Sequence, residues 1–541
     1  MNSLTVALIS ILVFGLGYEF YRRKLTLMWD VSETRKTPAL TKYNGADYVP
    51  SKNWLFLFGH HFSSIAGAGP ILGPVIACAI WGWLPAVLWV VLGSVFIGGV
   101  HDFSALMISV RNEGSSIADI SEKVLGQKAK IFFSVFVFLA LILVIAAFAV
   151  VTAKTFISTP QIVIPTFGLI GVAVIFGFMI YKWNVNSFLA TAVSLAVVAL
   201  LILLGNKYPL GLRCANPKVV WILILFVYAG AASVAPVNLL LQPRDYLSSF
   251  FLFAGLIAGY AGLIFSHPHI NAPAIATFNS VKGLLWPTMF IIIACGANSG
   301  FHSLVSSGTT SKQLSNEKYA FRIGYGAMIA EGALAILAIL AVTAGLKWEG
   351  CNSYPALMRG GDWIGTFAAG FGEISRPVMG VYGSFFAMLF LNAFVMTTLD
   401  TATRITRYVG QELFGSTFKI KILGNSIVMT VFIVVLAYWF STGPQARVWP
   451  VFGASNQLIA ALVLLIIAAW LFFKGKSSLF VFVPGVFMLV TTFFALLIEV
   501  KHNFGEDNLL FAISSLLLIM TVFMVYETVK KFIKIKEYHG R

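Results

Sequence analysis

Carboxyl groups inside apolar segments are the residues of this sequence that are best suited to chemistry. Glu331 is the acid that lies well inside an apolar run, between Ile329-Ala330 and Gly332-Ala333-Leu334. Burial favours the neutral form of a carboxyl group, so a buried acid can take up and release a proton near neutral pH. Glu331 is therefore the first candidate proton carrier. The alternative is a structural carboxylate that is paired with a neighbouring helix.

Two further acids lie nearer the ends of apolar runs. Asp102 follows His101, and histidine is a residue type that can also take up or release a proton. Asp400 lies four residues before Arg404 and on the same helix face, so a structural ion pair is at least as good an interpretation as a proton gate. With Glu331, both acids are candidate proton-coupling residues.

A second set of residues could bind a solute. The adjacent His60 and His61 cannot share one helix face, and His267 and His269 have no Cys or carboxylate neighbours, so we predict no metal site. The run 296–310 is dense in hydroxyls and amides, which suits a cavity wall and would also suit an alkali cation. A satisfied packing role is the alternative for the histidines. The candidate substrate-binding residues are His60, His61, Ser63, Gly67, Gly69, Ile71, Ser233, His302 and Ser303.

Membrane-spanning helices are the elements that must position these residues. The chain has 541 residues, of which 59% are hydrophobic and 11% charged, with a mean hydropathy of +0.88, whereas soluble domains carry about 25% charged residues. About fifteen stretches approach the ~20 apolar residues that a bilayer crossing needs. They are 3–20, 54–82, 84–110, 129–153, 161–181, 187–205, 217–242, 246–266, 286–310, 322–346, 378–403, 422–440, 453–473, 479–499 and 508–530. The sequence predicts an all-α polytopic membrane protein that is not an enzyme. An ATP-driven pump is not expected, because no nucleotide-binding motif is present.

The positive charges predict the orientation in the membrane. The net charge of +16 is spread in short runs between apolar stretches, which argues against a nucleic-acid partner. With the N-terminus extracytoplasmic and the C-terminus cytoplasmic, most of the 37 Lys and Arg residues fall on the cytoplasmic side, as is usual. Tyr21-Arg22-Arg23-Lys24 reads as a stop-transfer flank, so the first stretch is expected to be a retained helix.

The four cysteines show no metal-binding spacing. Cys214 and Cys351 fall in loops that the predicted orientation makes extracytoplasmic, where a disulfide can persist. Whether the two are bridged is left open by the sequence.

Two stretches are interrupted by Gly and Pro. One is 54–82, around Gly67-Ala68-Gly69-Pro70, and the other is 221–242, around Tyr228–Pro236. Counting spans makes the two run in opposite directions, which is typical of two inverted five-helix repeats. Free N–H groups at such a break bind anions, and close helix packing is the alternative reason for the small residues.

The repeats divide the chain into four regions. They are an N-terminal helix and basic loop (1–53), a first repeat (54–205), an inverted second repeat (217–412) and a four-helix C-terminal scaffold (422–541).

Five motifs in order resemble the carbon starvation protein A family. They are Gly59–Ile71, Val100–Phe103, His267–Pro273, Gly300–Thr310 and Thr398–Arg404, and the resemblance covers roughly residues 50 to 460. It implies an inner-membrane transporter of the amino acid, polyamine and organocation superfamily with a LeuT-like fold. The family is associated with peptide uptake during carbon starvation, and some members with proton-coupled pyruvate import.

These observations predict a secondary-active importer of peptides or pyruvate. The substrate carboxylate is expected at the N–H groups of Gly69 to Leu72, and the coupling ion is expected to be a proton, with sodium as the alternative. A membrane sensor or channel is the rival class. The expected partners are the substrate and the lipid bilayer, no cofactor is predicted, and the oligomeric state is left open.

Overall fold

The computed structural model describes the backbone of residues 1–442 and 449–539, and the side chains of residues 1–442 and 453–530. This part of the chain is mostly helical, because apolar segments in a bilayer satisfy their backbone N–H and C=O groups most simply within a helix. It contains twelve helices that are long and apolar enough to cross a membrane, or thirteen spans when a bent pair of helices is included. The prediction of a polytopic helical membrane protein is confirmed.

Long helices and short helical turns follow one another along the whole described chain. The first part contains α1 (Ser3–Met28), α2 (Pro38–Thr41), α3 (Trp54–Ile65), α4 (Gly69–Trp81), α5 (Trp83–Gly93), α6 (Gly99–Arg111), α7 (Ile117–Leu125) and α8 (Gln127–Ser158). The middle part contains α9 (Val163–Tyr181), α10 (Ser187–Lys207), α11 (Pro217–Val234), α12 (Leu241–Ser266), α13 (Phe290–Ile292), α14 (Ala294–Ala297) and α15 (Gly300–Gly308). The last part contains α16 (Ala320–Gly345), α17 (Tyr354–Arg359), α18 (Trp363–Met379), α19 (Gly383–Gly410), α20 (Ser426–Thr442), α21 (Trp449–Phe473), α22 (Leu479–Asn503) and α23 (Asn508–His539). The short strands β1 (Asn279–Ser280) and β2 (Gly283–Leu284) pair in the loop before α13.

Three elements differ from the sequence prediction. The stretch 286–310 is divided into short helices, and 422–440 forms a helix of 17 residues, α20, which is shorter than a usual span. Helix α18 was not predicted, because Gly and charged residues keep its hydropathy low. The C-terminal scaffold region also includes residues 443–448 and 540–541, which lie outside the described residues.

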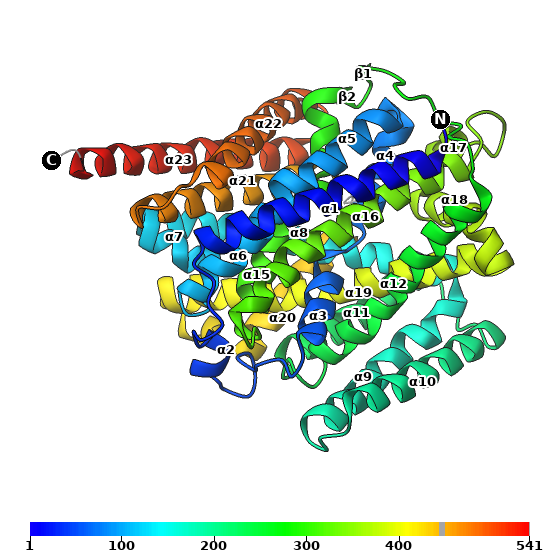
Figure 1. The fold of residues 1–541 in the computed structure, drawn as a ribbon, viewed down its shortest axis with the longest axis horizontal. Helices are drawn as coiled ribbons and strands as arrows, with labels where there is room; N and C mark the ends of the chain where they lie inside the picture. The colour runs from blue at the N-terminus through cyan, green and yellow to red at the C-terminus, as the bar shows by residue number, and fades with distance from the viewer. Residues whose placement is uncertain (443–448, 540–541) are drawn as a thin grey trace.

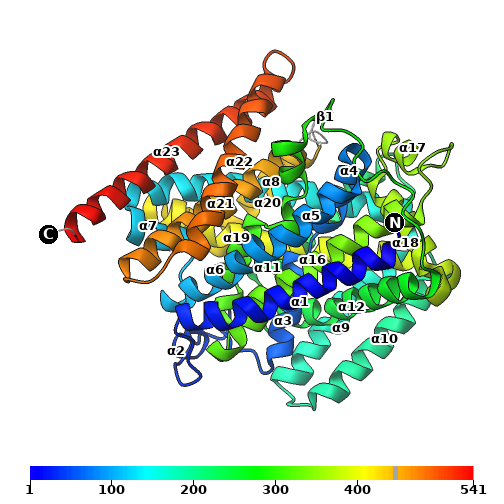
Figure 2. The same cartoon turned by 45° about the horizontal axis from the view of Figure 1, so that its top comes forward.

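Figures 1 and 2 show how the helices are arranged around the centre of the molecule. Helices α1, α12, α16 and α19 run broadly along one another, with α3, α4, α6 and α15 between them. The α9–α10 pair forms one flank, and α22 and α23 form the opposite flank. The central helices therefore have other helices on both flanks in the two views.

Loops that alternate along the sequence gather at two ends of this bundle. At one end, the N–H of Ser3 donates to Pro268 O at 3.1 Å and the N–H of Asn271 donates to Thr343 O at 2.8 Å. At the other end, the N–H of Val237 donates to Ala46 O at 3.0 Å. We call the first the N-terminal end and the second, which holds residues 29–53, 235–240 and 309–319, the basic end.

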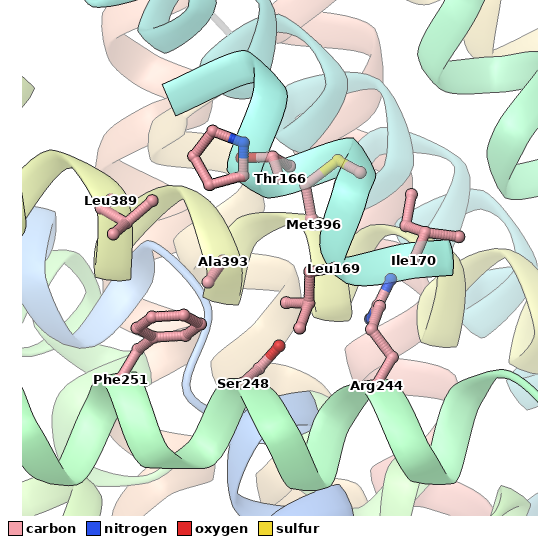
Figure 3. Close-up of a pocket in the computed structure, with 10 residues that line it drawn as sticks. Thr166, Leu169, Ile170, Arg244, Ser248, Phe251, Leu389, Ala393 and Met396 are labelled. Carbon is pink, nitrogen blue, oxygen red and sulfur yellow. The ribbon is translucent and has the colours of Figure 1, made fainter. Parts of the chain in front are cut away.

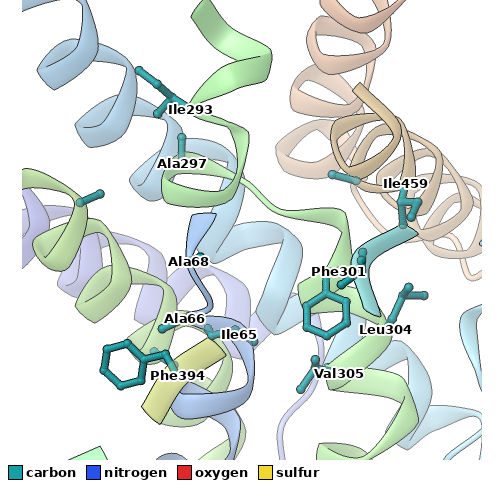
Figure 4. Close-up of a cluster of buried hydrophobic side chains, with 14 of the residues drawn as sticks. Ile65, Ala66, Ala68, Ile293, Ala297, Phe301, Leu304, Val305, Phe394 and Ile459 are labelled. Carbon is teal, nitrogen blue, oxygen red and sulfur yellow. The ribbon is translucent and has the colours of Figure 1, made fainter. Parts of the chain in front are cut away.

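The first predicted helix break is present. Helices α3 and α4 are bent by 41° across residues 66–68, where Ala66 and Ala68 lie between the two helical segments (Figure 4). The second predicted break, at Tyr228–Pro236, is wrong as a mid-membrane interruption. Helix α11 simply ends at Val234, because Pro236 cannot continue it, and the following loop lies at the basic end.

A different break lies against the first one. Helix α14 ends at Ala297, Asn298 and Ser299 are extended, and α15 begins at Gly300. A Cβ atom on Gly296 would lie 3.3 Å from Pro70 Cα, so the two interruptions touch. Figure 4 shows Ala297 and Phe301 near Ala66 and Ala68. In the described part of the chain, the broken helix α3–α4 therefore lies against the interrupted segment α14–α15.

Candidate functional site

Four buried titratable side chains form a line across three helices beside the second break. Oε2 of Glu331 on α16 lies 3.2 Å from Nε2 of His302 on α15. Nδ1 of His302 lies 2.8 Å from Oδ2 of Asp102 on α6, whose Oδ1 lies 2.8 Å from Nδ1 of His101. All four side chains are fully buried. We call this line, Glu331–His302–Asp102–His101, the acid–histidine chain.

The carboxyl group of Glu331 is incompletely satisfied. Its contact with His302 is short, but the angle does not meet hydrogen-bond geometry, and neither oxygen has a hydrogen-bond partner among the described residues. Burying a carboxylate without hydrogen bonds is costly. No Lys or Arg in the described part of the chain forms an ion pair with Glu331, so the structural salt bridge that the sequence left open is absent there. This carboxyl group is suited to exchanging a proton with His302.

The break at Asn298–Ser299 explains how His302 is held. It leaves N–H groups at the start of α15 without helical partners, and Asn456 from α21 accepts a hydrogen bond from the Phe301 N–H at 2.8 Å. The Asn456 amide also donates to Ser299 Oγ at 2.9 Å. Helix α21, which was predicted to be only scaffold, thus fixes the first turn of α15 and with it His302.

A second group of buried charges lies at the start of α12. Nη2 of Arg244 donates to Asp400 Oδ1 on α19 at 2.9 Å and to Asp245 Oδ1 at 2.8 Å, while Nη1 donates to Asp400 and to the Tyr228 hydroxyl. Tyr228 on α11 donates to Asp400 Oδ2 at 2.7 Å. Oδ2 of Asp245 lies 2.6 Å from Nδ1 of His60 on α3. We call Arg244, Asp245, Asp400, Tyr228 and His60 the arginine cluster.

Sequence reasoning missed three members of this cluster. It placed residues 243–245 in a loop between two apolar stretches, whereas α12 begins at Leu241 and carries Arg244 and Asp245 near its start. Tyr228 was read only as part of an interrupted helix. The available signal was the Arg244-Asp245 pair itself, since adjacent charges between two apolar stretches are costly unless they are paired inside the protein.

The Asp400–Arg404 ion pair, which the sequence left open as an alternative to a proton gate, is not formed. Arg404 extends towards the basic end, where Nη1 donates to Asp47 Oδ1 at 2.9 Å and Nη2 donates to Ala232 O at 3.0 Å. The hydroxyl of Tyr408 also donates to Asp47. Asp400 instead takes its cation from α12, because its side chain faces that helix. The two residues thus belong to different parts of the molecule.

The other predicted binding residues are divided between the arginine cluster, helix α15 and the basic end. His61 Nδ1 lies 2.8 Å from Thr310 Oγ1, and Ser63 Oγ donates to Asp245 O at 2.8 Å, next to the arginine cluster. Ser303 donates within its own helix, to Gly300 O at 2.6 Å. Ser233 accepts a hydrogen bond from Arg407 Nε at 3.3 Å, near the basic end. Of these candidates, His60 and Ser63 meet at one cluster, and His302 lies in the other.

Gly67, Gly69 and Ile71 lie at the first break, which is tightly packed. A Cβ atom on Gly69 would lie 2.3 Å from Cys295 Cβ. The N–H groups of Ile71 and Leu72, which were expected to receive an anion, both donate to Ala68 O, at 3.2 and 2.9 Å. In this conformation, an anion reaches them only if the first turn of α4 opens.

All four cysteines are free. Cys214 and Cys351 are exposed and unbridged, so the disulfide that the sequence left open is not formed. Within the described residues, no group of three or more His, Cys, Asp or Glu side chains is arranged to hold a metal ion.

Apolar spans that enclose two fully buried groups of charged side chains define a class: polytopic membrane proteins with a charged interior, to which solute carriers belong. Comparison with known proteins gives the family. Residues 2–360 and 352–495 match the family described as Carbon starvation protein CstA, and the chain belongs to it.

Several curated relatives cover most of the chain. The Peptide transporter CstA of Campylobacter jejuni is 30% identical, over 91% of this chain and 80% of the relative. That of Bacillus subtilis is 30% identical, over 98% and 97% of the two chains. The Pyruvate/proton symporter BtsT of Escherichia coli is 29% identical, over 92% of this chain and 81% of the relative. These relatives are named as transporters rather than enzymes.

Among solved structures, a manganese transporter of Eremococcus coleocola aligns with a TM-score of 0.48 and 14% identity, over 92% of this chain and 99% of that chain. This likeness is too distant to indicate a cargo.

Proposed function

We propose that this protein is a secondary-active importer of small nutrients with a carboxylate, peptides or pyruvate, and that it is a proton symporter used in carbon starvation. The names of its relatives, peptide transporters and a pyruvate/proton symporter, support this substrate class. The acid–histidine chain is the observation that carries the proton part of the proposal.

The acid–histidine chain can pass a proton without moving the backbone. Rotation of the Glu331 side chain would align its carboxyl group with His302, 3.2 Å away, for proton exchange, and Asp102 holds the other side of the His302 ring. Asp102 thereby orients the imidazole and stabilises its protonated form, as a carboxylate does for a histidine in many acid–base sites. Proton uptake changes the charge beside the break at Asn298–Ser299. That change biases the equilibrium between the outward-open and inward-open states.

We further propose that the fold is a LeuT-like arrangement of two inverted five-helix repeats. Several contacts support it, because they join elements at corresponding positions of two repeats. The broken segments α3–α4 and α14–α15 meet, α6 packs along α16, and α8 packs along α19. In addition, α12 packs on α3 in the same way that α21 packs on α15. These pairs favour a second repeat that begins with the broken stretch 285–308, in place of the predicted boundaries 54–205 and 217–412.

The proposed setting is the inner (cytoplasmic) membrane, with the N-terminus extracytoplasmic and the C-terminus cytoplasmic. The loops with the most Lys and Arg support it, because they meet at the basic end. There Lys476 Nζ donates to Met28 O at 2.8 Å, and Lys52 Nζ donates to Asn184 Oδ1 at 2.7 Å. The proposed partners are the substrate and the bilayer. We propose no cofactor, and a proton as the coupling ion.

Transport by purified protein in proteoliposomes tests the function. We expect an inward proton gradient to drive accumulation of radiolabelled pyruvate or dialanine, and an uncoupler to abolish it. Accumulation that is insensitive to the uncoupler and depends on sodium would replace the proton with sodium. Conductance far above carrier rates would indicate a channel instead.

The variant Glu331→Gln tests the role of the acid–histidine chain. The amide mimics the protonated carboxyl group at almost the same volume, so we expect normal folding and normal exchange of internal for external substrate. Proton-driven accumulation should be lost, because the side chain no longer changes charge. Glu499→Gln, in α22, is the matched control and should accumulate substrate normally. Normal accumulation by Glu331→Gln would remove Glu331 from the mechanism.

A further inference from the structure

A small cavity lies beside the arginine cluster, between α9, α12 and α19. Its volume is about 20 Å³, which is room for about one water molecule. Figure 3 shows Arg244 and Ser248 extending from α12 towards Leu169 and Ile170 of α9, with Met396 of α19 beside them. Outside α12, the lining residues are apolar except for Thr166 of α9. The Thr166 hydroxyl already donates to Ile162 O at 2.6 Å and accepts from Asn392 at 2.9 Å.

Two hydrogen-bond donors on the α12 side find no acceptor in the described part of the chain. Arg244 uses both of its terminal nitrogens on the arginine cluster, but its Nε–H has no hydrogen-bond partner among the described residues. Ser248 follows one helical turn later and is fully buried, and its Oγ is also unpaired there. Buried donors are nearly always satisfied, so an unpaired Arg Nε–H and Ser hydroxyl on one cavity point to a ligand that accepts hydrogen bonds.

The charge of the arginine cluster restricts when an anion can enter. Asp400 is surrounded by Arg244 and Asp245 of α12 and by Tyr228 of α11, and His60 of α3 contacts Asp245 from the far side. Helix α9 carries no charged residue, and the lysines of α8 lie near its two ends. Two carboxylates therefore already compensate one guanidinium. A third carboxylate is repelled unless one of the two becomes neutral.

We propose that the Arg244–Ser248 cavity is the subsite for the carboxylate of the transported substrate, and that it accepts this carboxylate when Asp400 is protonated. The inference rests on the proposed function and names the site of its substrate. Protonation of Asp400 weakens its ion pair with Arg244. The substrate carboxylate then pairs with Arg244 instead and accepts a second hydrogen bond from the Ser248 hydroxyl. The proton on Asp400 thereby compensates the charge of the bound anion.

The apolar wall suits the rest of a small substrate. Leu169 of α9 and Met396 of α19 offer an apolar surface opposite the donors, where a methyl group or a small side chain would lie. Phe251 adds an apolar ring beside Ser248 on α12. A carboxylate needs more room than one water molecule. We infer that the wall which moves is α9, since it forms the outer flank with α10 (Figure 1).

Binding of matched ligands to the full chain tests the subsite. The probes are pyruvate with its neutral amide, pyruvamide, and dialanine with its C-terminal amide. They are measured by isothermal titration calorimetry at about pH 6 and about pH 8, on either side of the neutral range in which buried carboxyl groups titrate. We expect the wild type to bind a carboxylate probe more tightly at the lower pH, and to bind the amides weakly at both.

Three variants separate the parts of the proposal. Ser248→Ala removes one hydrogen bond to a charged group without altering buried charge, and should weaken carboxylate binding about tenfold. Ser249→Ala is the matched control, because Ser249 Oγ donates to Tyr246 O within α12, and it should bind like the wild type. Arg244→Lys keeps the charge but lacks the Nε–H, and should lose binding. Asp400→Asn should bind at the higher pH as tightly as the wild type binds at the lower pH.

The outcomes separate this inference from the proposed function. If the wild type binds none of the carboxylate probes, both the proposed substrate class and the proposed subsite are wrong. If the wild type binds a probe but Ser248→Ala and Arg244→Lys bind it equally well, the substrate class stands and the subsite is wrong. If Asp400→Asn keeps the pH dependence, the link to Asp400 protonation is wrong.

Discussion

At the residue scale, Asp47 holds a loop of the basic end against helix α19. It lies in the loop 43–53, outside the spans, where it accepts hydrogen bonds from Arg404 and Tyr408 of α19. Burial would raise the pKa of Asp47, but the Tyr408 hydroxyl and the Arg404 and Arg407 guanidinium groups outweigh it, so the pKa lies below its ordinary value. The contact ties a surface loop to a helix that also carries Asp400.

The lowered pKa of Asp47 predicts that this contact is insensitive to pH in the physiological range. A carboxylate whose pKa is lowered in the folded state contributes stability above its unfolded pKa, about 3.9. It loses that stability only as the pH falls through the lower, folded value. We therefore expect hydrogen–deuterium exchange of residues 43–53, corrected for its intrinsic pH dependence, to be constant from about pH 5 to about pH 8.

Asp47→Asn should open the same loop at every pH in that range. It removes charge-assisted hydrogen bonds worth about 1.5–3 kcal/mol each, so exchange should be at least about tenfold faster. Glu33→Gln is the control, since Glu33 is exposed and pairs with Lys318 on the surface. Unchanged exchange in Asp47→Asn would show that other contacts hold the loop.

At the scale of elements, close packing joins the two broken helices. A Cβ atom on Gly73 of α4 would lie 2.3 Å from the backbone oxygen of Ile292, and one on Gly69 would meet Cys295. Small residues thus let the backbones of α4 and the segment 292–297 approach each other, as they do in many membrane helix pairs. The same packing keeps the first turn of α4 closed.

This packing predicts that Gly73→Ala destabilises the protein. The obstructing atom belongs to the backbone, so the helices must separate, at a cost of about 1–3 kcal/mol. Gly171→Ala on α9 is the matched control, because nothing lies within 4 Å of its Cβ position. It should be neutral or stabilising by up to about 1 kcal/mol, since Ala favours a helix. Thermal unfolding in one detergent checks both variants, and an equal melting temperature would contradict the packing argument.

At the scale of the whole molecule, one end carries the basic loops and the other carries the exposed cysteines. The loops with Cys214 and Cys351 do not belong to the basic end: the first follows α10, and the second follows α16 next to the loop that contacts Ser3. Both cysteines are free and exposed, whereas Cys78 is buried. The native cysteines therefore report which end faces the outside of the cell.

The proposed orientation predicts that a membrane-impermeant maleimide labels Cys351 and Cys214 in intact cells. Variants with one exposed cysteine, in a background without the others, resolve the two sites. Lys36→Cys, in the loop at the basic end, should be labelled only after the membrane is permeabilised. The reverse pattern would place the N-terminus in the cytoplasm.

The sequence by itself determined the membrane spans and several functional candidates. A bilayer crossing requires a long apolar segment, and this requirement acts locally, so most spans could be predicted from hydropathy. A charged or titratable group in such a segment also stands out locally, as Glu331 and Asp102 did. Their partner His302 could be found because it lies in an unusually polar stretch.

Only the tertiary structure decided which of these groups meet. Asp400 pairs with Arg244 instead of its neighbour Arg404, and the first break packs against residues 292–300 instead of 228–236. These partners come from helices far apart in the chain. Each contact depends on how a helix is rotated about its own axis, and hydropathy does not encode that rotation, because in a bilayer the faces towards lipid and towards the protein interior are both apolar.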